Sequence, residues 1–290
     1  MFTLLKGKPV KDEIINYVTD TVQTLKESGT EPMLSVLRAG EDSGQIYYEQ
    51  SILKNAAKYG ISTRAVDLPE SVTQEELEAA LTELNDDDNV HGIIMLRPFP
   101  KHIDSDKLTA MLDPEKDIDA ITDMSIAGLF SGRGNSFYAC TAEACMEIAR
   151  YYCPELKGRK VTVLGRSLTV GKPLAIMMLN EHATVTICHS RTPKEDQIAA
   201  CRNADIVVLA TGQTESYGSE YFRNGHIVLD VGTGTGRKGT IAGDLDIEDI
   251  EAKGEISELA YTPVPGGVGV VTTTLLMRNV VNSAKRKANK

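Results

Sequence analysis

The stretch that decides the fold is "RKVTVLGRSLTVGKPLAIMMLNEHATVTICHS", residues 159–190. It contains a strand rich in β-branched residues, a turn with two glycines, a helix and a second strand. Two neighbouring strands that are joined by a helix run parallel. Further short apolar runs follow in "DIVVLATG" (205–212) and "GHIVLDVG" (225–232). This alternation predicts a doubly wound, mostly parallel sheet that binds its ligand at the carboxyl ends of the strands.

The turn itself carries the first functional signal. Gly165 at the strand end permits a tight turn, and Gly171 lets the next helix begin close to a ligand. The free N–H groups at such a helix start suit a pyrophosphate. The spacing G-x-S-x-x-x-G differs from the commoner G-x-G-x-x-G. The spacing alone is modest evidence for a nucleotide site, and the order strand, turn, helix, strand strengthens it. The alternative is a plain glycine-rich turn in an α/β core.

The following strand indicates which nucleotide is bound. An NAD enzyme usually places an acidic residue about 20 residues beyond the glycines, to hold the ribose hydroxyls. Here the strand ends in His189, Ser190 and Arg191, with no acid. Ser190 and Arg191, with Arg166 in the turn, suit a 2′-phosphate through charge-assisted hydrogen bonds. We therefore predict NADP in preference to NAD; the competing interpretation makes Arg191 an ordinary surface residue.

The first half of the chain also alternates between strand and helix patterns. Three short apolar runs predict strands: "PMLSVLRAG" (32–40), "STRAVDLP" (62–69) and "VHGIIMLRPFP" (90–100). Three segments with helical periodicity alternate with them: 9–28, 44–59 and 73–87. A second, mostly parallel α/β domain is therefore expected.

Composition limits the classes of protein. The 290 residues are 41% hydrophobic and 25% charged, which suits two globular domains. A formal net charge of −10 disfavours a general nucleic-acid or anionic-membrane surface. Five cysteines without a C-x-x-C spacing predict buried free thiols, with neither a disulfide framework nor a metal site. No signal peptide or membrane-spanning run is evident, so we expect a cytoplasmic protein.

Several motifs together resemble the methylenetetrahydrofolate dehydrogenase/cyclohydrolase (FolD-like) family. They are "GRSLTVGKP" (165–173), "NADIVVLATG" (203–212), "HIVLDVG" (226–232) and "YTPVPGGVGVVTTTLL" (261–276). "PEKDIDA" (114–120) matches a further family segment, with Ala120 where glycine is usual. The resemblance spans nearly the whole chain.

The resemblance implies a folate-binding α/β domain and a Rossmann-type dinucleotide-binding domain, with a cleft between them. We expect the folate domain over residues 1–139, with a C-terminal helix (272–290) packing back onto it. The Rossmann domain is expected over residues 140–271. The resemblance further implies a tetrahydrofolate derivative as substrate, NADP as cofactor and a homodimer.

Site residues follow by position from the same resemblance. Tyr48 is expected to stack near the pterin, and Asp119 to hydrogen-bond the pterin ring, whereas Asp117 and Asp123 are interpreted as acidic loop residues. The backbone of Pro265, Gly266 and Gly267 is expected to face folate and nicotinamide. The expected cofactor site comprises Gly165, Arg166, Ser167, Gly171, Ser190, Arg191, Thr211 and Gly232.

Two reactions make different demands on such a site. Hydride transfer from the bridging methylene carbon requires positioning and electrostatics, but no proton acceptor. Hydrolysis of the resulting methenyl cation needs an activated water, for which a general base contributes roughly 10²–10⁴-fold. In the family this role falls to a lysine four residues after the tyrosine, supported by a glutamine at a strand end. The matching positions here are Ile52 and Leu96.

We therefore predict a dehydrogenase whose cyclohydrolase activity is lost or greatly weakened. Lys54 does not restore the pair, because it lies about 120° around the helix from Tyr48. Ser51, four residues after Tyr47, lacks an activator. Arg97, at a normally apolar position, stays protonated and therefore cannot act as the base. It is interpreted as a group that holds the substrate's carboxylate or the cofactor, or else as a solvent-facing residue.

Three alternatives stay open on the sequence alone. The chain could be a full bifunctional enzyme with a displaced base such as Lys54 or with a water chain. It could be a shikimate-type Rossmann dehydrogenase, which the segment "TPVPGGVG" (262–269) argues against. It could also be a folate- or nucleotide-binding protein without turnover.

Overall fold

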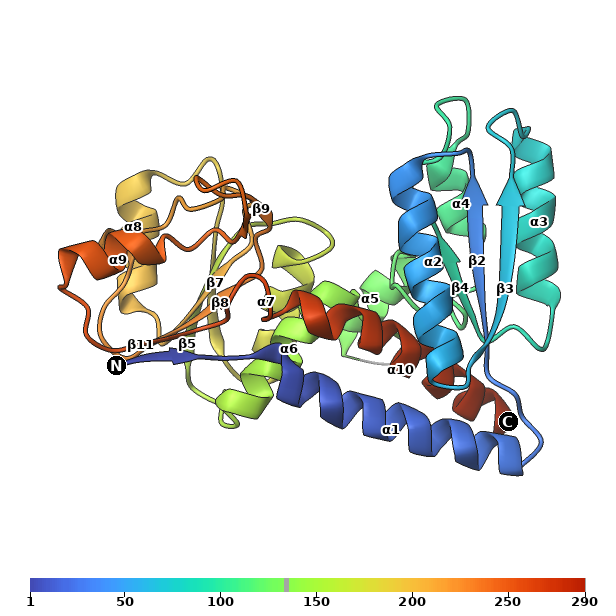
Figure 1. Ribbon diagram of the computed structural model, residues 1–290, viewed down its shortest axis with the longest axis horizontal. Coiled ribbons are helices and arrows are strands. Elements are labelled where there is room, and N and C mark those ends of the chain that lie inside the picture. Colours follow the sequence, from blue (N-terminus) through green and yellow to red (C-terminus); the bar gives the residue numbers. More distant parts are fainter. Residues whose placement is uncertain (133–135, 290) are drawn as a thin grey trace. The chain divides into compact units, whose positions relative to one another are not determined.

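A computed structural model describes residues 1–132 and 136–289 (Figure 1). The chain forms two compact units, which we name by their sheets. The six-stranded unit comprises Met1–Asp12 and Ala139–Thr272. The three-stranded unit comprises Glu13–Tyr138 and Thr273–Lys290.

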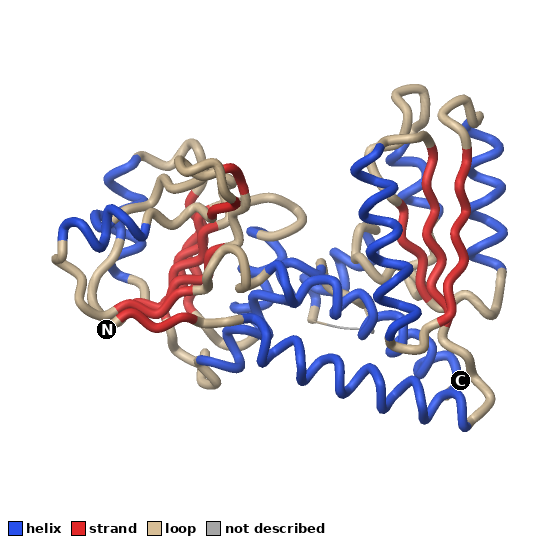
Figure 2. The backbone as a smooth tube through the Cα atoms, viewed as in Figure 1, coloured by secondary structure: helices blue, strands red, loops and turns tan. Residues whose placement is uncertain are grey.

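The sheet of the six-stranded unit is parallel throughout, in the order β1-β11-β8-β7-β5-β6. Figure 2 draws strands in red and helices in blue. Its strands are β1 (Phe2–Leu4), β5 (Lys160–Leu164), β6 (Thr184–Cys188), β7 (Ile206–Leu209), β8 (His226–Asp230) and β11 (Leu259–Tyr261). The chain passes from β5 to β6 on one side and returns to β7 on the other. In open α/β sheets a ligand binds where the strand order reverses in this way. The predicted doubly wound sheet is confirmed.

Helices and one small hairpin connect these strands. The helices are α6 (Cys140–Tyr152), α7 (Gly171–Asn180), α8 (Lys194–Asn203), a short 3₁₀ helix (Ser219–Tyr221) and α9 (Ile247–Lys253). The hairpin pairs β9 (Gly234–Thr235) with β10 (Ile241–Ala242). Apolar side chains from α8, β7, β8 and the 3₁₀ helix form one core, which includes Cys201, Val207, Val228 and Phe222.

The first residues of the chain differ from the sequence-based domain boundary. Residues 1–139 were expected to form the first domain, but Met1–Asp12 group with the six-stranded unit. The reason is that β1 pairs in parallel with β11, with Thr3 opposite Ala260. A three-residue strand with mostly exposed side chains has no hydrophobic period that sequence inspection could detect.

The three-stranded unit is built on the parallel sheet β3-β2-β4. Its strands are β2 (Met33–Ala39), β3 (Ser62–Leu68) and β4 (Gly92–Met95). The helices are α1 (Gly7–Glu27), α2 (Ser43–Lys58), α3 (Gln74–Asp86), α4 (Ser105–Met111), α5 (Asp123–Ser131) and α10 (Gly269–Ala288). The first residues of α1 and α10 belong to the six-stranded unit.

Local signals set the helix starts: Asp42 caps α2 through the N–H of Gln45 at 2.9 Å, and Thr73 and Glu76 form a capping box on α3.

The two faces of this sheet carry different layers. Leu37 and Met95 point toward a core with α3 and α4, in which Leu77 and Leu108 are fully buried. Successive strand residues alternate between faces. The opposite face therefore carries Arg38, and α2 covers that face, because Arg38 pairs with Glu49 of α2.

Leu96 continues the pairing of β4 beyond its last strand residue, since its N–H donates to Leu37 O at 2.9 Å. Met95 pairs with Leu37 and Arg38 pairs with Asp67. Leu96, Arg38 and Asp67 thus form one row across the sheet, on the face that α2 covers.

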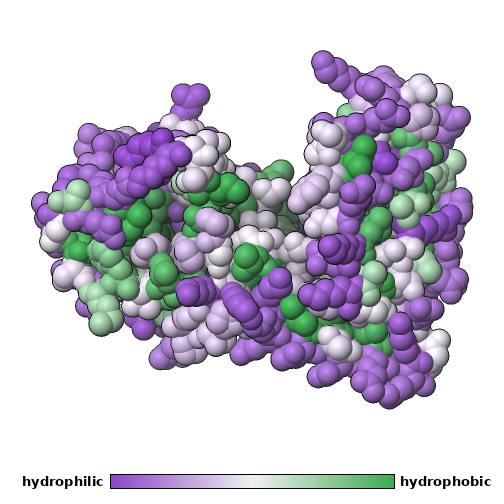
Figure 3. Space-filling view, viewed as in Figure 1, coloured by the Kyte–Doolittle hydropathy of each residue, from purple (hydrophilic) through white to green (hydrophobic). Residues whose placement is uncertain are grey.

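Surface properties agree with the composition. Hydrophilic side chains prevail on the face shown in Figure 3, with hydrophobic side chains between them. Among the described residues, no helix is long and apolar enough to cross a membrane. The prediction that the five cysteines are buried is confirmed.

A single close approach tests the packing of the three-stranded unit. A Cβ at Gly92 would lie 2.8 Å from Ile118 Cγ2 and 3.1 Å from Val280 Cγ2 of α10. Gly92→Ala should therefore destabilise the protein by about 1–3 kcal/mol, because buried Ile118 has little room to move. Gly269→Ala is the control, since a Cβ there meets nothing within 4 Å. Thermal unfolding of both variants is the measurement; equal midpoints would contradict this packing.

Candidate active site

The turn after β5 can be made only with glycine at its two ends. Gly165 has a φ of +127°, and a Cβ there would lie 2.2 Å from Ala210 O at the end of β7. A Cβ at Gly171 would lie 2.2 Å from Gly165 O. The turn is therefore packed against the point where the strand order reverses, which is the expected ligand position.

Ser167 organises the inside of this turn. Its hydroxyl accepts from Val170 N at 3.1 Å and from Gly171 N at 3.4 Å, and its carbonyl accepts from Lys172 N at 3.0 Å. These bonds shape the turn that leads into α7, a ten-residue helix that begins at Gly171. A tight glycine turn before a helix N-terminus fits the phosphates of a dinucleotide.

The turn after β6 carries the residues expected at a 2′-phosphate. Thr192 N donates to His189 O at 2.8 Å, and Arg191 N donates to His189 Nδ1 at 3.1 Å. With the backbone tied in this way, the side chains of Ser190 and Arg191 are exposed, as is that of Arg166 in the glycine turn. They are available to a phosphate.

A cavity of about 260 Å³ lies beside the turn after β6. Ser190 and Thr211, both predicted cofactor residues, line it together, with His189, Gln197 and the aromatic pair Tyr217 and Tyr221. Arg166 and Arg191 are not among its lining residues.

Thr211 and Gly232 owe their positions to Asp244, a residue that the sequence analysis missed. The buried carboxylate of Asp244 accepts from Thr211 N and Oγ1, both at 2.8 Å, and from Gly212 N at 3.0 Å. A Cβ at Gly232 would lie 2.1 Å from Asp244 Oδ1. The Thr211 hydroxyl is thus occupied by Asp244, and Gly232 is needed for a close approach. The only sequence signal was an acid next to a glycine in "AGDLD" (242–246).

Asp230 anchors the same region from the end of β8. Its carboxylate accepts from the backbone N–H groups of Gly232 at 3.1 Å, Asp244 at 3.0 Å and Leu245 at 2.9 Å. Burial raises the pKa of Asp230 to about 7, and these hydrogen bonds oppose that shift. Asp230 therefore holds the loop that presents Asp244.

The predicted Pro265, Gly266 and Gly267 form a tight turn before α10. Gly266 has a φ of +107°, and its carbonyl accepts from Gly7 N at 2.9 Å. A Cβ at Gly267 would lie 2.6 Å from Pro263 O. This backbone is fixed by packing, and both glycines are required by its shape.

In the three-stranded unit, the two positions expected for the base and its partner are both buried. Ile52 is 0% exposed and Leu96 is 4% exposed. Tyr48, one helical turn before Ile52, is 47% exposed and lies at the edge of the buried face of α2. Lys54 is exposed and Tyr47 is 76% exposed, so neither belongs to that buried face.

The same face of α2 carries a charge cluster that the sequence analysis missed. Arg38 Nε lies 2.5 Å from Glu49 Oε2, and Arg38 Nη2 lies 2.8 Å from Asp67 Oδ1. Arg38 Nη1 also donates to Gly40 O. Burial raises the pKa of Glu49, and the hydrogen bond from Arg38 opposes that shift. An arginine inside the apolar run 32–40 was the available signal.

Asp119 lies on a segment that runs beside β4. Ile93 bridges to Asp117 in parallel, and Ile93 N donates to Lys116 O at 2.9 Å. Burial, with a contribution from Asp117, raises the pKa of Asp119 to about 6, and Arg97 acts in the opposite direction. The next residue, Ala120, has a φ of +56°, a conformation that favours glycine. The same backbone conformation explains why glycine is usual in the family at position 120.

Asp117 lies in the loop between α4 and α5, as interpreted, but its side chain is buried and has a structural role there. Asp117 is 0% exposed, and its carboxylate accepts from Ile121 N at 3.0 Å, Thr122 N at 2.9 Å and Ser125 Oγ at 2.7 Å. It therefore builds the turn that leads from Asp119 into α5. The interpretation of Asp123 as a loop residue is wrong, because Asp123 is the first residue of α5, where its side chain is exposed.

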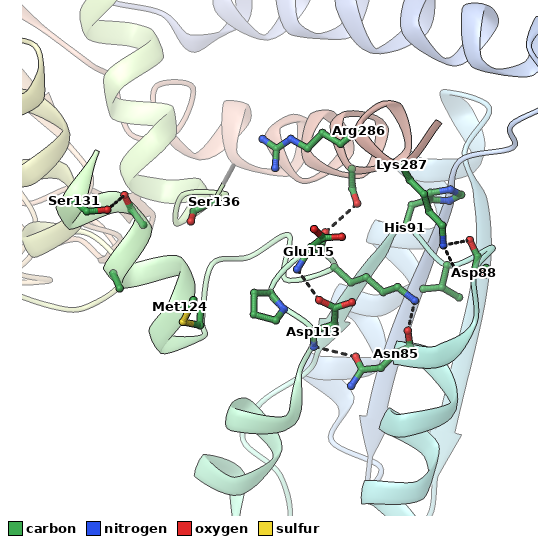
Figure 4. Close-up of a pocket in the computed structure, with 16 residues that line it drawn as sticks. Asn85, Asp88, His91, Asp113, Glu115, Met124, Ser131, Ser136, Arg286 and Lys287 are labelled. Carbon is green, nitrogen blue, oxygen red and sulfur yellow. Dashed lines mark hydrogen bonds and ion pairs between the residues drawn. The ribbon is translucent and has the colours of Figure 1, made fainter. Parts of the chain in front are cut away.

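A wider cavity of about 700 Å³ in the same unit contains none of the predicted site residues (Figure 4). Its charged groups have partners already. Lys116 Nζ donates to the carbonyls of Leu84, Asn85 and Asp87, and Lys287 pairs with Asp88. Within the described residues, no group of three or more His, Cys, Asp and Glu side chains could hold a metal ion.

The parallel sheet, its glycine turn and the groups beyond β6 define the six-stranded unit as a dinucleotide-binding domain. Residues 139–288 match the family model described as tetrahydrofolate dehydrogenase/cyclohydrolase, NAD(P)-binding domain. Residues 5–119 match the catalytic domain of the same family. The chain therefore belongs to the tetrahydrofolate dehydrogenase/cyclohydrolase family.

Individual relatives agree along the whole chain. A bifunctional protein FolD of Clostridioides difficile is 40% identical over 287 residues, which cover 99% of this chain and 98% of the relative. The FolD structure from Campylobacter jejuni is 35% identical, with a TM-score of 0.91 and 99% of each chain covered. The FolD structure from Trypanosoma brucei, which is complexed with NADP and an inhibitor, is 34% identical, with a TM-score of 0.87 and 99% of each chain covered.

Asp119 gives a prediction about pH and stability. Its pKa of about 6 lies above the ordinary value of 3.8, so the folded protein binds the proton more tightly than the unfolded chain. Stability from this proton is lost as pH rises from about 4 to above 6, by up to about 3 kcal/mol. Asp119→Asn should therefore raise the unfolding temperature relative to the parent more at pH 8 than at pH 4.5. Exposed Asp20→Asn is the control, and an equal change at both pH values would contradict the prediction.

Proposed function

We propose that the chain is an NADP-dependent 5,10-methylenetetrahydrofolate dehydrogenase whose cyclohydrolase activity is lost or greatly weakened. Family membership supports the dehydrogenase reaction. One observation carries the loss of hydrolysis: Ile52 and Leu96 are buried aliphatic side chains where a base and its amide partner are expected.

Hydride transfer suits the residues that are present. When bound, NADP supplies the hydride acceptor. The Gly165–Gly171 turn fits its phosphates, and Ser190 and Arg191 are available to its 2′-phosphate. On the folate side, Tyr48 offers an accessible ring and Asp119 offers a carboxylate to pterin N–H groups. The methylene carbon loses a hydride and becomes a cation that two nitrogens share, so no side chain has to remove a proton.

Hydrolysis needs a group that this face of α2 does not supply. Ile52 and Leu96 cannot exchange a proton. The carboxylate of Glu49 is held by Arg38. Arg38 and Arg97 are guanidinium cations, which already carry their proton and cannot accept another. Lys54 is exposed on another side of the helix. Within the described part of the chain, no observed contact joins the Ser51 hydroxyl to a base. A leftover polar partner would have been buried and unsatisfied, which explains why both positions are aliphatic.

Two competing functions keep specific support. The relatives named FolD are described as bifunctional, which favours a chain that retains both activities. The departures at Ile52, Leu96 and Ala120 are compatible with a protein that binds folate and nucleotide without turnover. A homodimer and a cytoplasmic location stay predictions.

Assays of the two half-reactions test the proposal. The protein should form NADPH from methylenetetrahydrofolate and NADP, whereas methenyltetrahydrofolate should be hydrolysed no faster than in buffer. The FolD of Clostridioides difficile, measured in parallel, is the positive control for hydrolysis. Hydrolysis at a rate matching the dehydrogenase would establish the bifunctional alternative. No NADPH formation with any folate would support the binding protein.

The choice of cofactor gives a separate prediction. Arg191→Ala should weaken NADP binding by about 10- to 100-fold, because a charge-assisted hydrogen bond to the 2′-phosphate contributes roughly 1.5–3 kcal/mol. Binding of NAD, which lacks this phosphate, should change little. Lys194→Ala is the matched control, since Lys194 lies three residues on and pairs with Glu220 at 2.8 Å. Dissociation constants from titration calorimetry with NADP and with NAD are the measurement; an equal loss of affinity for both would contradict the prediction.

A further inference from the structure

The buried face of α2 brings an acidic residue next to the position of the missing base. Its buried residues are Glu49, Ile52 and Ala56. Glu49 and Ile52 are three residues apart, so their side chains are neighbours on the helix surface, about 5–6 Å between Cβ atoms. Leu96 lies in the row of the sheet that also contains Arg38.

Glu49 belongs to a cluster with more negative than positive charge. Arg38 pairs with Glu49 at 2.5 Å and with Asp67 at 2.8 Å. The side chains of Arg38 and Glu49 are only 10% and 6% exposed, whereas that of Asp67 is 50% exposed. One guanidinium thus faces two carboxylates, a formal charge of −1. Arg38 on β2 and Asp67 on β3 are the charged groups that act on Glu49.

A cation placed beside this cluster would complete its charge balance. A lysine at position 52 would meet Glu49 across one helical turn, in a buried setting where opposite charges interact strongly. Its ammonium form would be favoured. A general base must instead be deprotonated near neutral pH.

We propose that Glu49 is a reaction-specificity residue: held by Arg38 beside position 52, its carboxylate makes this face of α2 unable to support a lysine base for water activation. This inference rests on the proposed loss of hydrolysis. It adds that the loss is distributed over three positions, 49, 52 and 96. Restoring the family's lysine and glutamine is then insufficient, because Glu49 holds the new lysine as a cation.

The test introduces the missing pair with and without the acid. The variants are I52K/L96Q and E49Q/I52K/L96Q, both measured for methenyltetrahydrofolate hydrolysis across pH. The first should show little hydrolysis at pH 7.5, with activity rising only at alkaline pH. The second should be about tenfold faster at pH 7.5, with its rising limb about one pH unit lower, because one pKa unit changes the deprotonated fraction tenfold.

Controls separate charge from folding. Gln50→Lys adds a lysine to the exposed side of the same helix and should give no hydrolysis. D67N/I52K/L96Q removes the more exposed carboxylate and leaves the Arg38–Glu49 contact in place, so its pH limb should move less than with E49Q. Dehydrogenase activity and cooperative thermal unfolding identify variants that fold. If E49Q/I52K/L96Q does not fold, the pH limb of D67N/I52K/L96Q against I52K/L96Q decides the question.

The outcomes distinguish this inference from the proposed function. Identical pH profiles with and without Glu49 would overturn the role of Glu49, and so would full hydrolysis by I52K/L96Q at pH 7.5. Neither result would change the account of the parent protein. Hydrolysis by the parent protein itself would overturn the proposed function, whatever the variants do.

Discussion

A buried helix face admits charge only when that charge is paired, and this constraint governs what α2 can do. Arg38 satisfies it for Glu49, because both side chains lie between helix and sheet and are joined at 2.5 Å. Ile52 satisfies it by having no charge, and so does Leu96, in the row of the sheet that contains Arg38. Because the four residues share one layer, a change at any of them alters which partners the others need. The four side chains therefore pack as a unit, and this packing decides which of them can carry a charge.

The six-stranded unit applies a comparable constraint to the backbone. Gly165 lies against Ala210 O, Gly171 against Gly165 O and Gly232 against Asp244, each closer than a side chain allows. Asp230 and Asp244 hold the intervening loops through backbone N–H groups. This preorganised frame leaves the side chains of Ser190 and Arg191 accessible to a cofactor. A rigid loop backbone with accessible side chains is well suited to hydride transfer, because this reaction depends on the positioning of the reactants.

Sequence inspection identified the parts of this molecule that depend on local patterns. The parallel sheets and the glycine turn follow from periodicity and from local motifs. The expectation of a base and an amide at positions 52 and 96 comes only from the family resemblance. Tertiary partners could not be inferred in the same way. The three donors to Asp117 come together only in the folded loop, and nothing in the sequence pairs Glu49 of α2 with Arg38 of β2. The short β1 carries no hydrophobic period at all. Each of these features depends on residues far apart in the sequence.

The most direct test of the central claim follows the product of a single reaction mixture. The protein is given methylenetetrahydrofolate and NADP, and NADPH and methenyltetrahydrofolate are monitored together under conditions where spontaneous hydrolysis is slow. If α2 presents no group that activates water, one methenyltetrahydrofolate should accumulate for each NADPH formed. Formation of NADPH with formyltetrahydrofolate as the product, and without accumulation of the methenyl compound, would contradict the account.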